Sequence, residues 1–279
     1  MIRIGIILFL ALVRLFSCSE PNKRSNPSLT EKATQSKPES MIQFKLYANS
    51  VNIKIKGDPA TSAIVFISLH DDETTAQEVV SSYLKENHAA FIRIENNKQR
   101  LIRFSYLKES YVFDPNRMFT NKGRRLTLGL HGAYSDSAAA KVNEFASLVL
   151  QQLSTAKTVV AVHNNSNGKF SILSYLKGGE FFKNAKQVYK NPASDPDDLF
   201  LTTSPQLFER LKTKGFNIVL QDNVNVADNG SLSFYHRNIN KRYVNIEAQD
   251  GHFAKQLEML QALVSVLEPS SLRKPVLAQ

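Results

Sequence analysis

Two short apolar runs constrain the fold of this chain more than any other feature. The run AIVFISL occupies residues 63–69, and the run TVVAV occupies residues 158–162. Strands without polar alternation are buried on both faces, as they are in parallel sheets covered by helices. Helical patterns lie beside these runs, at 75–86 and 137–153. This alternation predicts an α/β fold: a three-layer αβα arrangement with a mixed, largely parallel central sheet.

Shorter patterns complete the predicted sheet and its helices. Residues 42–48 and 51–57 alternate between apolar and polar side chains, so we expect a hairpin at one edge of the sheet. Asp136 or Ser137 is the predicted cap of the longest helix. Further strands are predicted at 90–95, 100–107, 169–173, 216–221, 231–237 and 242–248, and further helices at 204–214 and 251–268.

The charge of the chain is basic but spread out. Its 279 residues carry a formal net charge of +10, which is compatible with nucleic acid, an anionic membrane, anionic substrates or simple solubility. The densest basic stretches are NKGRR at 121–125 and NINKR at 238–242, and neither contains interleaved aromatic residues. We interpret both as solvated loops and expect no nucleic-acid partner.

The first 18 residues differ from the rest of the chain. Arg3 precedes an apolar run over residues 4–13, which is too short to span a bilayer and has the length of a signal-peptide core. Leu15 stands three residues before Cys18, and the stretch LFSC resembles a bacterial lipobox with Cys18 as the lipidated first residue. An ordinary signal peptide cleaved nearby is the alternative. Both predict export to the cell envelope or periplasm.

A polar segment separates this leader from the predicted domain. Residues 19–40 are rich in Ser, Pro and Lys, a composition that is typical of a flexible tether. We therefore expect a signal peptide at 1–18, a tether at 19–40 and a folded domain at 41–279, held near a membrane by the lipid anchor. Cys18 is the only cysteine, so any metal in the folded domain must be bound through nitrogen and oxygen.

Polar residues follow three of the predicted strands. His70 comes directly after the run at 63–69 and Glu73 three residues later, whereas His163 ends the second run and Glu247 lies near the end of a later strand. Open α/β sheets carry their sites beyond the carboxyl ends of the strands. If these strands are parallel neighbours, the four side chains converge on one crevice.

Three of these residues form a set of metal ligands. His70 and Glu73 can chelate one ion if the chain turns between them, and His163 adds a second imidazole. Two imidazoles and one carboxylate are a recurring ligand set of catalytic zinc, with a fourth position open to water. Manganese or iron also accepts such a set. The alternative is that each histidine is a hydrogen-bonded structural residue.

Four motifs, taken in order, resemble a known family. They are HDDE at 70–73, DPNR at 114–117, VAVH at 160–163 and VNIEA at 244–248. Their order resembles that of the zinc carboxypeptidases and their relatives, the succinylglutamate desuccinylase and aspartoacylase branch. The resemblance extends over residues 60–268.

The resemblance implies a role for six residues. It implies that His70, Glu73 and His163 bind one zinc ion per chain. It further implies that Asn116 and Arg117 bind a substrate carboxylate and that Glu247 is the general base. The chemistry agrees, because the planar guanidinium binds carboxylates bidentately, and a carboxylate near zinc can take a proton from the attacking water.

Some positions of the family pattern stay open. The family has an arginine that stabilises the oxyanion, for which Arg100 and Arg103 are both candidates. A mobile tyrosine is also common in the family, and Tyr235 or Tyr243 could fill that place. Asp71 and Asp72 either orient the ligands or simply face water at the start of a helix. His252 is a further candidate for orienting a site residue.

The expected function is that of an exported, zinc-dependent, carboxypeptidase-like hydrolase, with residues 41–279 as its catalytic domain. The substrate would carry an amide bond adjacent to a free carboxylate, and the envelope location suggests peptidoglycan stem peptides. One alternative is an N-acyl amino acid deacylase of the same superfamily, since the visible residues are shared. The other is a non-catalytic envelope binding protein, which would need no general base.

Overall fold

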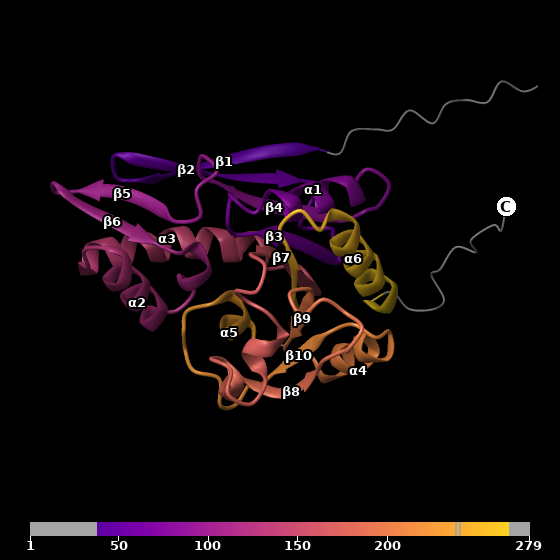
Figure 1. Ribbon diagram of the computed structural model, residues 1–279. Helices are drawn as coiled ribbons and strands as arrows, with labels where there is room; N and C mark the ends of the chain where they lie inside the picture. The colour runs from indigo at the N-terminus through magenta and orange to yellow at the C-terminus, as the bar shows by residue number, and fades with distance from the viewer. Residues whose placement is uncertain (1–37, 238, 240, 268–279) are drawn as a thin grey trace, which may run out of the picture. The chain divides into compact units, whose positions relative to one another are not determined.

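The central sheet is formed by strands from all parts of the chain that the structure describes. The computed structural model describes residues 38–237, 239 and 241–267. The strands are β1 (Glu39–Leu46), β2 (Asn49–Lys56), β3 (Ile64–Ser68), β4 (Ala90–Glu95), β5 (Ile102–Tyr106), β6 (Glu109–Phe113), β7 (Thr158–Asn165), β8 (Ala185–Tyr189), β9 (Leu199–Thr202), β10 (Ile218–Gln221) and β11 (Arg242–Gln249). Within the described residues, nine of them form one sheet in the order β1-β2-β4-β3-β7-β11-β9-β10-β8, and β5 pairs with β6 separately (Figure 1).

Helices cover both faces of this sheet. They are α1 (Thr74–Tyr83), α2 (Asn121–His131), α3 (Asp136–Gln152), α4 (Pro205–Thr213), α5 (Leu232–His236) and α6 (Phe253–Leu267), with 3₁₀ turns η1 (Pro115–Arg117), η2 (Ile172–Tyr175) and η3 (Phe182–Asn184). The strands β4, β3, β7 and β11 at the centre are parallel, and antiparallel strands flank them. The predicted αβα fold with a mixed sheet and a parallel centre is confirmed.

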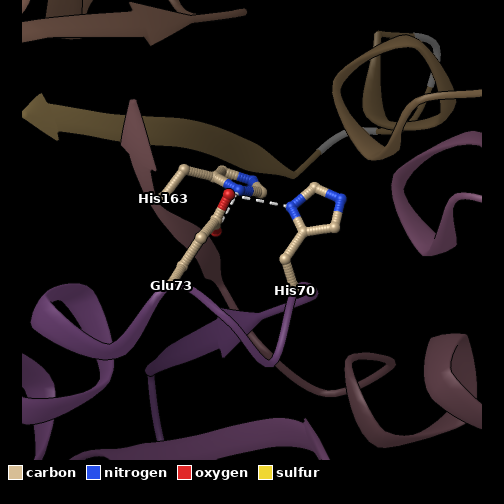
Figure 2. Close-up of side chains that lie close together, drawn as sticks. All are labelled: His70, Glu73 and His163. Atoms are coloured by element: carbon tan, nitrogen blue, oxygen red, sulfur yellow. Dashed lines mark hydrogen bonds and ion pairs between the residues drawn. The ribbon is translucent and has the colours of Figure 1, made fainter. Parts of the chain in front are cut away.

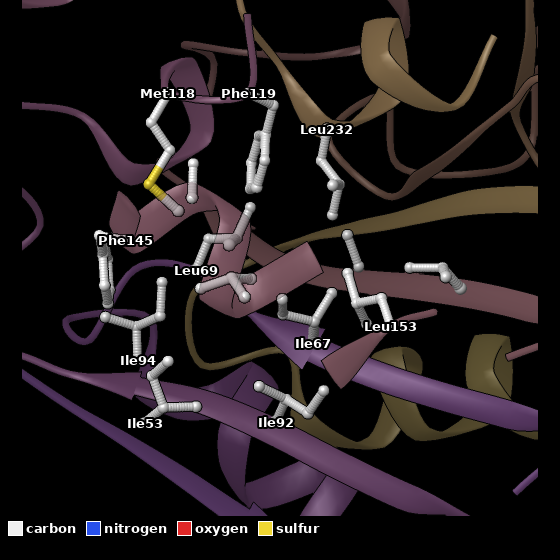
Figure 3. Close-up of a cluster of buried hydrophobic side chains, with 14 of the residues drawn as sticks. Ile53, Ile67, Leu69, Ile92, Ile94, Met118, Phe119, Phe145, Leu153 and Leu232 are labelled. Carbon is white, nitrogen blue, oxygen red and sulfur yellow. The ribbon is translucent and has the colours of Figure 1, made fainter. Parts of the chain in front are cut away.

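The two apolar runs are buried because the two faces of the sheet support separate cores. Phe66 packs with α1, α4 and α6 on one face, whereas Ile67 packs with α3 on the other. Figure 3 shows Ile67 beside Ile92, and Phe145 of α3 beside Ile94, in the second of these cores. A strand between two apolar layers cannot alternate between apolar and polar side chains, which explains the uninterrupted pattern.

Three segments fold differently from the sequence prediction. Residues 231–237, predicted as a strand, form α5, because Ser231 caps the helix by accepting the Phe234 amide. The strand predicted at 169–173 is wrong as well, since this segment is a turn leading into η2. Residues 121–125, predicted as a solvated loop, are the first turns of α2, which Thr120 caps at the Gly123 amide.

Other boundaries differ by small amounts, and three strands were not predicted. The cap of α3 is Ser135, which accepts the Ala138 amide, and not Asp136 or Ser137. The strands β6, β8 and β9 have no counterpart among the sequence predictions. β1 begins at Glu39, inside the segment expected to be a tether.

The predicted signal peptide at 1–18, Cys18 and residues 19–37 of the predicted tether lie outside the described residues, as do Asn238 and Asn240 of the second basic stretch. Within the described part of the chain, no helix combines the length and the apolar character needed to cross a membrane.

Candidate metal centre

His70 and Glu73 lie on the turn that joins β3 to α1. The His70 carbonyl accepts the Glu73 amide at 3.4 Å, so the chain turns between the two residues. Glu73 occupies the cap position of α1, but its side chain makes no capping hydrogen bond. The shorter side chains of Ser, Thr, Asp and Asn usually cap the helix at this position. Here the Glu73 carboxylate is free to meet the two histidines instead.

The Glu73 carboxylate joins the two histidines. His70 Nδ1 lies 2.9 Å from Glu73 Oε1, and His163 Nδ1 lies 2.8 Å from Glu73 Oε2. Figure 2 shows the carboxylate between the two imidazole rings, whose centres are 5.2 Å apart. All three side chains are buried, and one candidate ligand atom from each lies within 4.8 Å of the others.

The charges in this cluster are strongly coupled. Burial opposes the charged form of His70, but the carboxylates of Glu73 and Asp114 outweigh it and raise the pKa of His70 to about 9. Burial alone would raise the pKa of Glu73, yet the two histidines hold that pKa well below its usual range. The cluster therefore favours positive charge at the place where the two Nδ1 atoms meet the carboxylate.

The donor set fits a divalent cation. A cation at this position would replace the protons between two Nδ1 atoms and a carboxylate, giving the two-imidazole, one-carboxylate set of catalytic zinc. A purely structural histidine usually has both ring nitrogens bonded. His163 does not, since its Nε2 is buried and has no hydrogen-bond partner among the described residues.

Asp114 is a site residue that the sequence analysis did not assign. Its Oδ1 lies 2.8 Å from His70 Nε2 and also accepts the Asn116 amide at 2.7 Å. Although burial opposes its charged form, the hydrogen bond from His70 and the charge of Arg117 hold the pKa of Asp114 well below its usual range. A carboxylate on the outer nitrogen of a ligand histidine fixes the ring orientation and tautomer. Its position as the first residue of DPNR was the available signal.

Asn116 and Arg117 are held by close backbone packing. Arg117 Nη1 donates to the Asn116 carbonyl at 2.8 Å, and Asn116 Oδ1 accepts the Leu232 amide at 3.2 Å. A Cβ on Gly123 would collide with the Arg117 carbonyl and with Gly230, so α2 can approach this turn only because position 123 is glycine. Within the described part of the chain, Arg117 forms no ion pair with a carboxylate, and its charge remains available to a ligand.

Glu247 lies on β11, directly opposite His163 on β7. The carboxyl is buried, and its Oε1 accepts a hydrogen bond from Asn245 Nδ2 at 2.8 Å. Burial raises the pKa of Glu247, which His163 partly counteracts. A carboxylate with a raised pKa is a stronger base, as a group that must take up a proton near neutral pH requires.

All six predicted site residues line one cavity of about 490 Å³. These residues are His70, Glu73, Asn116, Arg117, His163 and Glu247. The structure thus brings together segments that are up to 177 residues apart (247 − 70). Their assignment as ligands, substrate-binding residues and base remains a prediction. Phe170 and Phe181 add an apolar part to the wall of the cavity.

The structure separates the open arginine and tyrosine candidates. Arg100 lines the cavity and donates to Glu73 Oε1 at 2.7 Å, whereas the side chain of Arg103 is exposed on β5. Neither tyrosine candidate lines the cavity. Tyr243 is fully buried and stacks on His236, so it is not a mobile residue of the site.

The remaining acids of HDDE have different environments. Asp71 is buried and its Oδ2 accepts the backbone amides of Asn96 and Lys98, so it ties the loop after β4 to the turn. Asp72 is exposed at the rim of the cavity. Neither acid forms a hydrogen bond with the His70 or His163 side chain in the described part of the chain. His252 contacts Asp198 at 3.5 Å and does not line the cavity.

Comparisons with known proteins give weak similarities. No model of a known protein family and no curated protein sequence matches the chain. A candidate metallopeptidase from Shewanella baltica has a TM-score of 0.41 and 11% identity, covering 81% of this chain and 84% of that chain. A candidate succinylglutamate desuccinylase/aspartoacylase family protein from Shewanella amazonensis has a TM-score of 0.41 and 9% identity, covering 82% and 72%. The apo cell shape determinant protein Csd4 from Helicobacter pylori has a TM-score of 0.43 and 13% identity, covering 82% and 54%.

At this level of similarity the function must be argued from the residues of the site.

Proposed function

We propose that this chain is a zinc-dependent hydrolase that cleaves an amide bond adjacent to a free carboxylate. The observation that carries the proposal is the buried cluster of His70, Glu73 and His163, opposite a buried carboxyl at Glu247. A structural hydrogen-bond network would not need a base with a raised pKa beside an incompletely bonded histidine.

Each residue around the cluster has a separate role in the proposed reaction. Bound zinc supplies Lewis acidity, which polarises a carbonyl and lowers the pKa of water. Glu247 takes the proton from the attacking water and delivers it to the leaving amine. Arg100, 2.7 Å from Glu73, is placed beside the ligands where negative charge would develop during attack.

Arg117 selects substrates with a free carboxylate. Its guanidinium lines the cavity without an ion pair to any described carboxylate, and its fork matches a carboxylate in two parallel hydrogen bonds. Asn116 is adjacent and lines the same cavity. The reacting amide would then lie between the pair Asn116 and Arg117 and the cluster of His70, Glu73 and His163.

For the biological substrate we propose peptides of the cell envelope, with peptidoglycan stem peptides first. This choice rests on the signal-like leader with Cys18 and predicts a protein that is exported and attached to a membrane by lipid. The alternative, an N-acyl amino acid deacylase, would bind its substrate carboxylate through the same Asn116 and Arg117 and would use the same base. A binding module without turnover would need Asn116 and Arg117 but not Glu247.

Metal content is the measurement that tests this proposal. The purified protein should contain about one zinc per chain by mass spectrometry, and His163→Ala should lose it. His88 is exposed, so His88→Ala is the matched control and should keep the metal. Absence of metal from the wild type after incubation with zinc, manganese and iron would rule out the hydrolase and leave a hydrogen-bonded structural cluster.

A further inference from the structure

A second cavity lies at the opposite end of the central strands. It has a volume of about 360 Å³ and is lined by the residues that precede β7 and begin β11, and by those that follow β9. Thr158 begins β7, and His163 lies five residues further along the same strand. At roughly 3.3 Å per residue this separates the two cavities by about 16 Å. The second cavity is therefore distinct from the candidate metal centre.

Four cationic side chains line this second cavity, which we call the basic cavity. They are Lys157, Arg237, Lys241 and Arg242. The lining contains no aspartate or glutamate, and none of the four forms an ion pair with a carboxylate in the described part of the chain. Like charges gathered without a counter-ion repel each other, so their convergence needs a separate explanation.

Two of these cations are held in place by the fold. The Lys241 ammonium donates to the carbonyl of Leu153, the residue that follows α3, at 3.1 Å, and to that of Ser154. Arg237 donates to the Phe234 carbonyl at 3.1 Å, and its guanidinium stacks on the Phe234 ring at 3.4 Å. These groups do not extend freely into water, and a ligand would lose little entropy in ordering them.

Neutral donors line the same cavity. Thr203 and Ser204 precede α4, a helix of nine residues whose cap is Ser204, and Gln206 lies in its first turn. The amino end of a helix carries a partial positive charge and favours anions. The side chain of Asn223 completes this polar side of the wall.

We propose that the basic cavity binds a phosphate group, presented either by a soluble phosphate compound or by an anionic lipid headgroup. Several positive charges and hydroxyl donors around one small space match a tetrahedral, multiply charged anion better than a single carboxylate. Guanidinium groups bind phosphate oxygens bidentately. This function is independent of hydrolysis at the other end of the sheet.

The first experiment measures the dissociation constant for inorganic phosphate at low ionic strength by calorimetry. The variant Lys157→Gln/Arg242→Gln should raise this constant at least tenfold. The control Lys45→Gln/Arg103→Gln removes the same charge from exposed positions and should change it less than twofold. If the double variant does not fold, Lys157→Gln alone, at an exposed side chain, should still weaken binding severalfold.

Two further arms identify the source of the phosphate and the site that binds it. Co-sedimentation with phosphatidylglycerol vesicles that the double variant abolishes would identify a lipid headgroup. Phosphate binding that the double variant weakens, together with no co-sedimentation of the wild type with these vesicles, would identify a soluble compound. Arg117→Gln, in the other cavity, should leave phosphate binding unchanged. The proposal is overturned if Arg117→Gln abolishes binding, if both double variants weaken it equally, or if the wild type binds neither probe.

Discussion

His163 and Glu247 occupy directly opposed positions on the neighbouring parallel strands β7 and β11. Opposed residues of paired strands point to the same face of the sheet, and neighbouring strands are about 4.8 Å apart. A predicted metal ligand and a predicted base therefore meet across one strand spacing. A register shift of one residue would turn Glu247 to the opposite face of the sheet, so strand register decides whether this site exists.

Removal of the base should abolish turnover and spare the metal. In Glu247→Gln we expect kcat to fall by roughly 10²- to 10⁴-fold, the usual contribution of general base catalysis. Zinc content should stay at the wild-type value, because Glu247 is not among the predicted ligands. Glu86→Gln, at an exposed position, is the matched control. Unchanged kcat in Glu247→Gln would exclude its role as base, whereas absence of turnover in the wild type would favour the binding module.

Asn245 should set the pH at which Glu247 acts. Its amide donates to Glu247 Oε1 at 2.8 Å, which stabilises the charged carboxylate and opposes the effect of burial. Asn245→Ala removes this donor, so the pKa of Glu247 should rise further. The acid limb of the profile of kcat/KM against pH should consequently move to higher pH. A loss of activity that is equal at every pH would mean that Asn245 has only a structural role.

Asp114 should control metal affinity through His70. Loss of a carboxylate behind a ligand histidine typically weakens metal binding by about 10- to 100-fold. We expect a weakening of this size in Asp114→Asn, measured by competition with a zinc-binding dye. Asp136→Asn changes an exposed carboxyl in the same way and should have no effect. Equal affinities in the two variants would show that the contact between Asp114 and His70 does not support a metal.

Arg117 should account for the preference for free carboxylates. Hydrogen bonds to charged groups contribute about 1.5–3 kcal/mol, so Arg117→Ala should lower kcat/KM for a substrate with a free carboxylate by roughly 10- to 100-fold. The carboxamide form of the same substrate should react slowly with the wild type and lose little further in the variant. Arg103→Ala serves as control. Equal losses on both substrates would place the carboxylate elsewhere.

His236 should make the folded state less stable in mild acid. Burial lowers the pKa of His236 to about 4, while its value in the unfolded chain is about 6.5. Between these values the unfolded chain binds a proton that the folded chain does not, so stability falls as pH falls. The free energy of unfolding should therefore fall by about 2 kcal/mol from pH 7 to pH 5.

Chemical denaturation at the two pH values tests this effect. His236→Phe keeps a ring against Tyr243. The difference between its free energies of unfolding at pH 7 and pH 5 should be about 2 kcal/mol smaller than in the wild type, whatever its absolute stability. His88→Phe makes the same change at an exposed position and should keep the wild-type difference. An unaltered pH dependence in His236→Phe would show that this histidine is not kept neutral by burial.

Local patterns could identify the strands and helices whose environment is uniform. The buried strands at 63–69 and 158–162 could be predicted because both of their faces pack against apolar layers, which requires consecutive apolar residues. The strand prediction for 231–237 is wrong, because the same pattern also fits a short helix with a serine cap, which is the structure that the segment adopts. In such short segments the tertiary contacts decide between strand and helix.

The candidate site could be predicted only in part. The types and order of His70, Glu73 and His163 point to metal chemistry, and the resemblance added the role of Glu247 as general base. Asp114 belongs to the motif DPNR, but its role could not be predicted, because its partner His70 is 44 residues away in the chain. The choice of Arg100 over Arg103 likewise depends on which side chain faces the cavity.

The sequence by itself determined the layered α/β class and the set of residues able to do chemistry, since both follow from side-chain type and local spacing. Only the tertiary structure decided that β3, β7 and β11 are parallel neighbours in a register that opposes His163 to Glu247. It alone also brought the four cations of the basic cavity together at the other end of the strands. Strand order and register arise from contacts between distant segments, and no local pattern encodes such contacts.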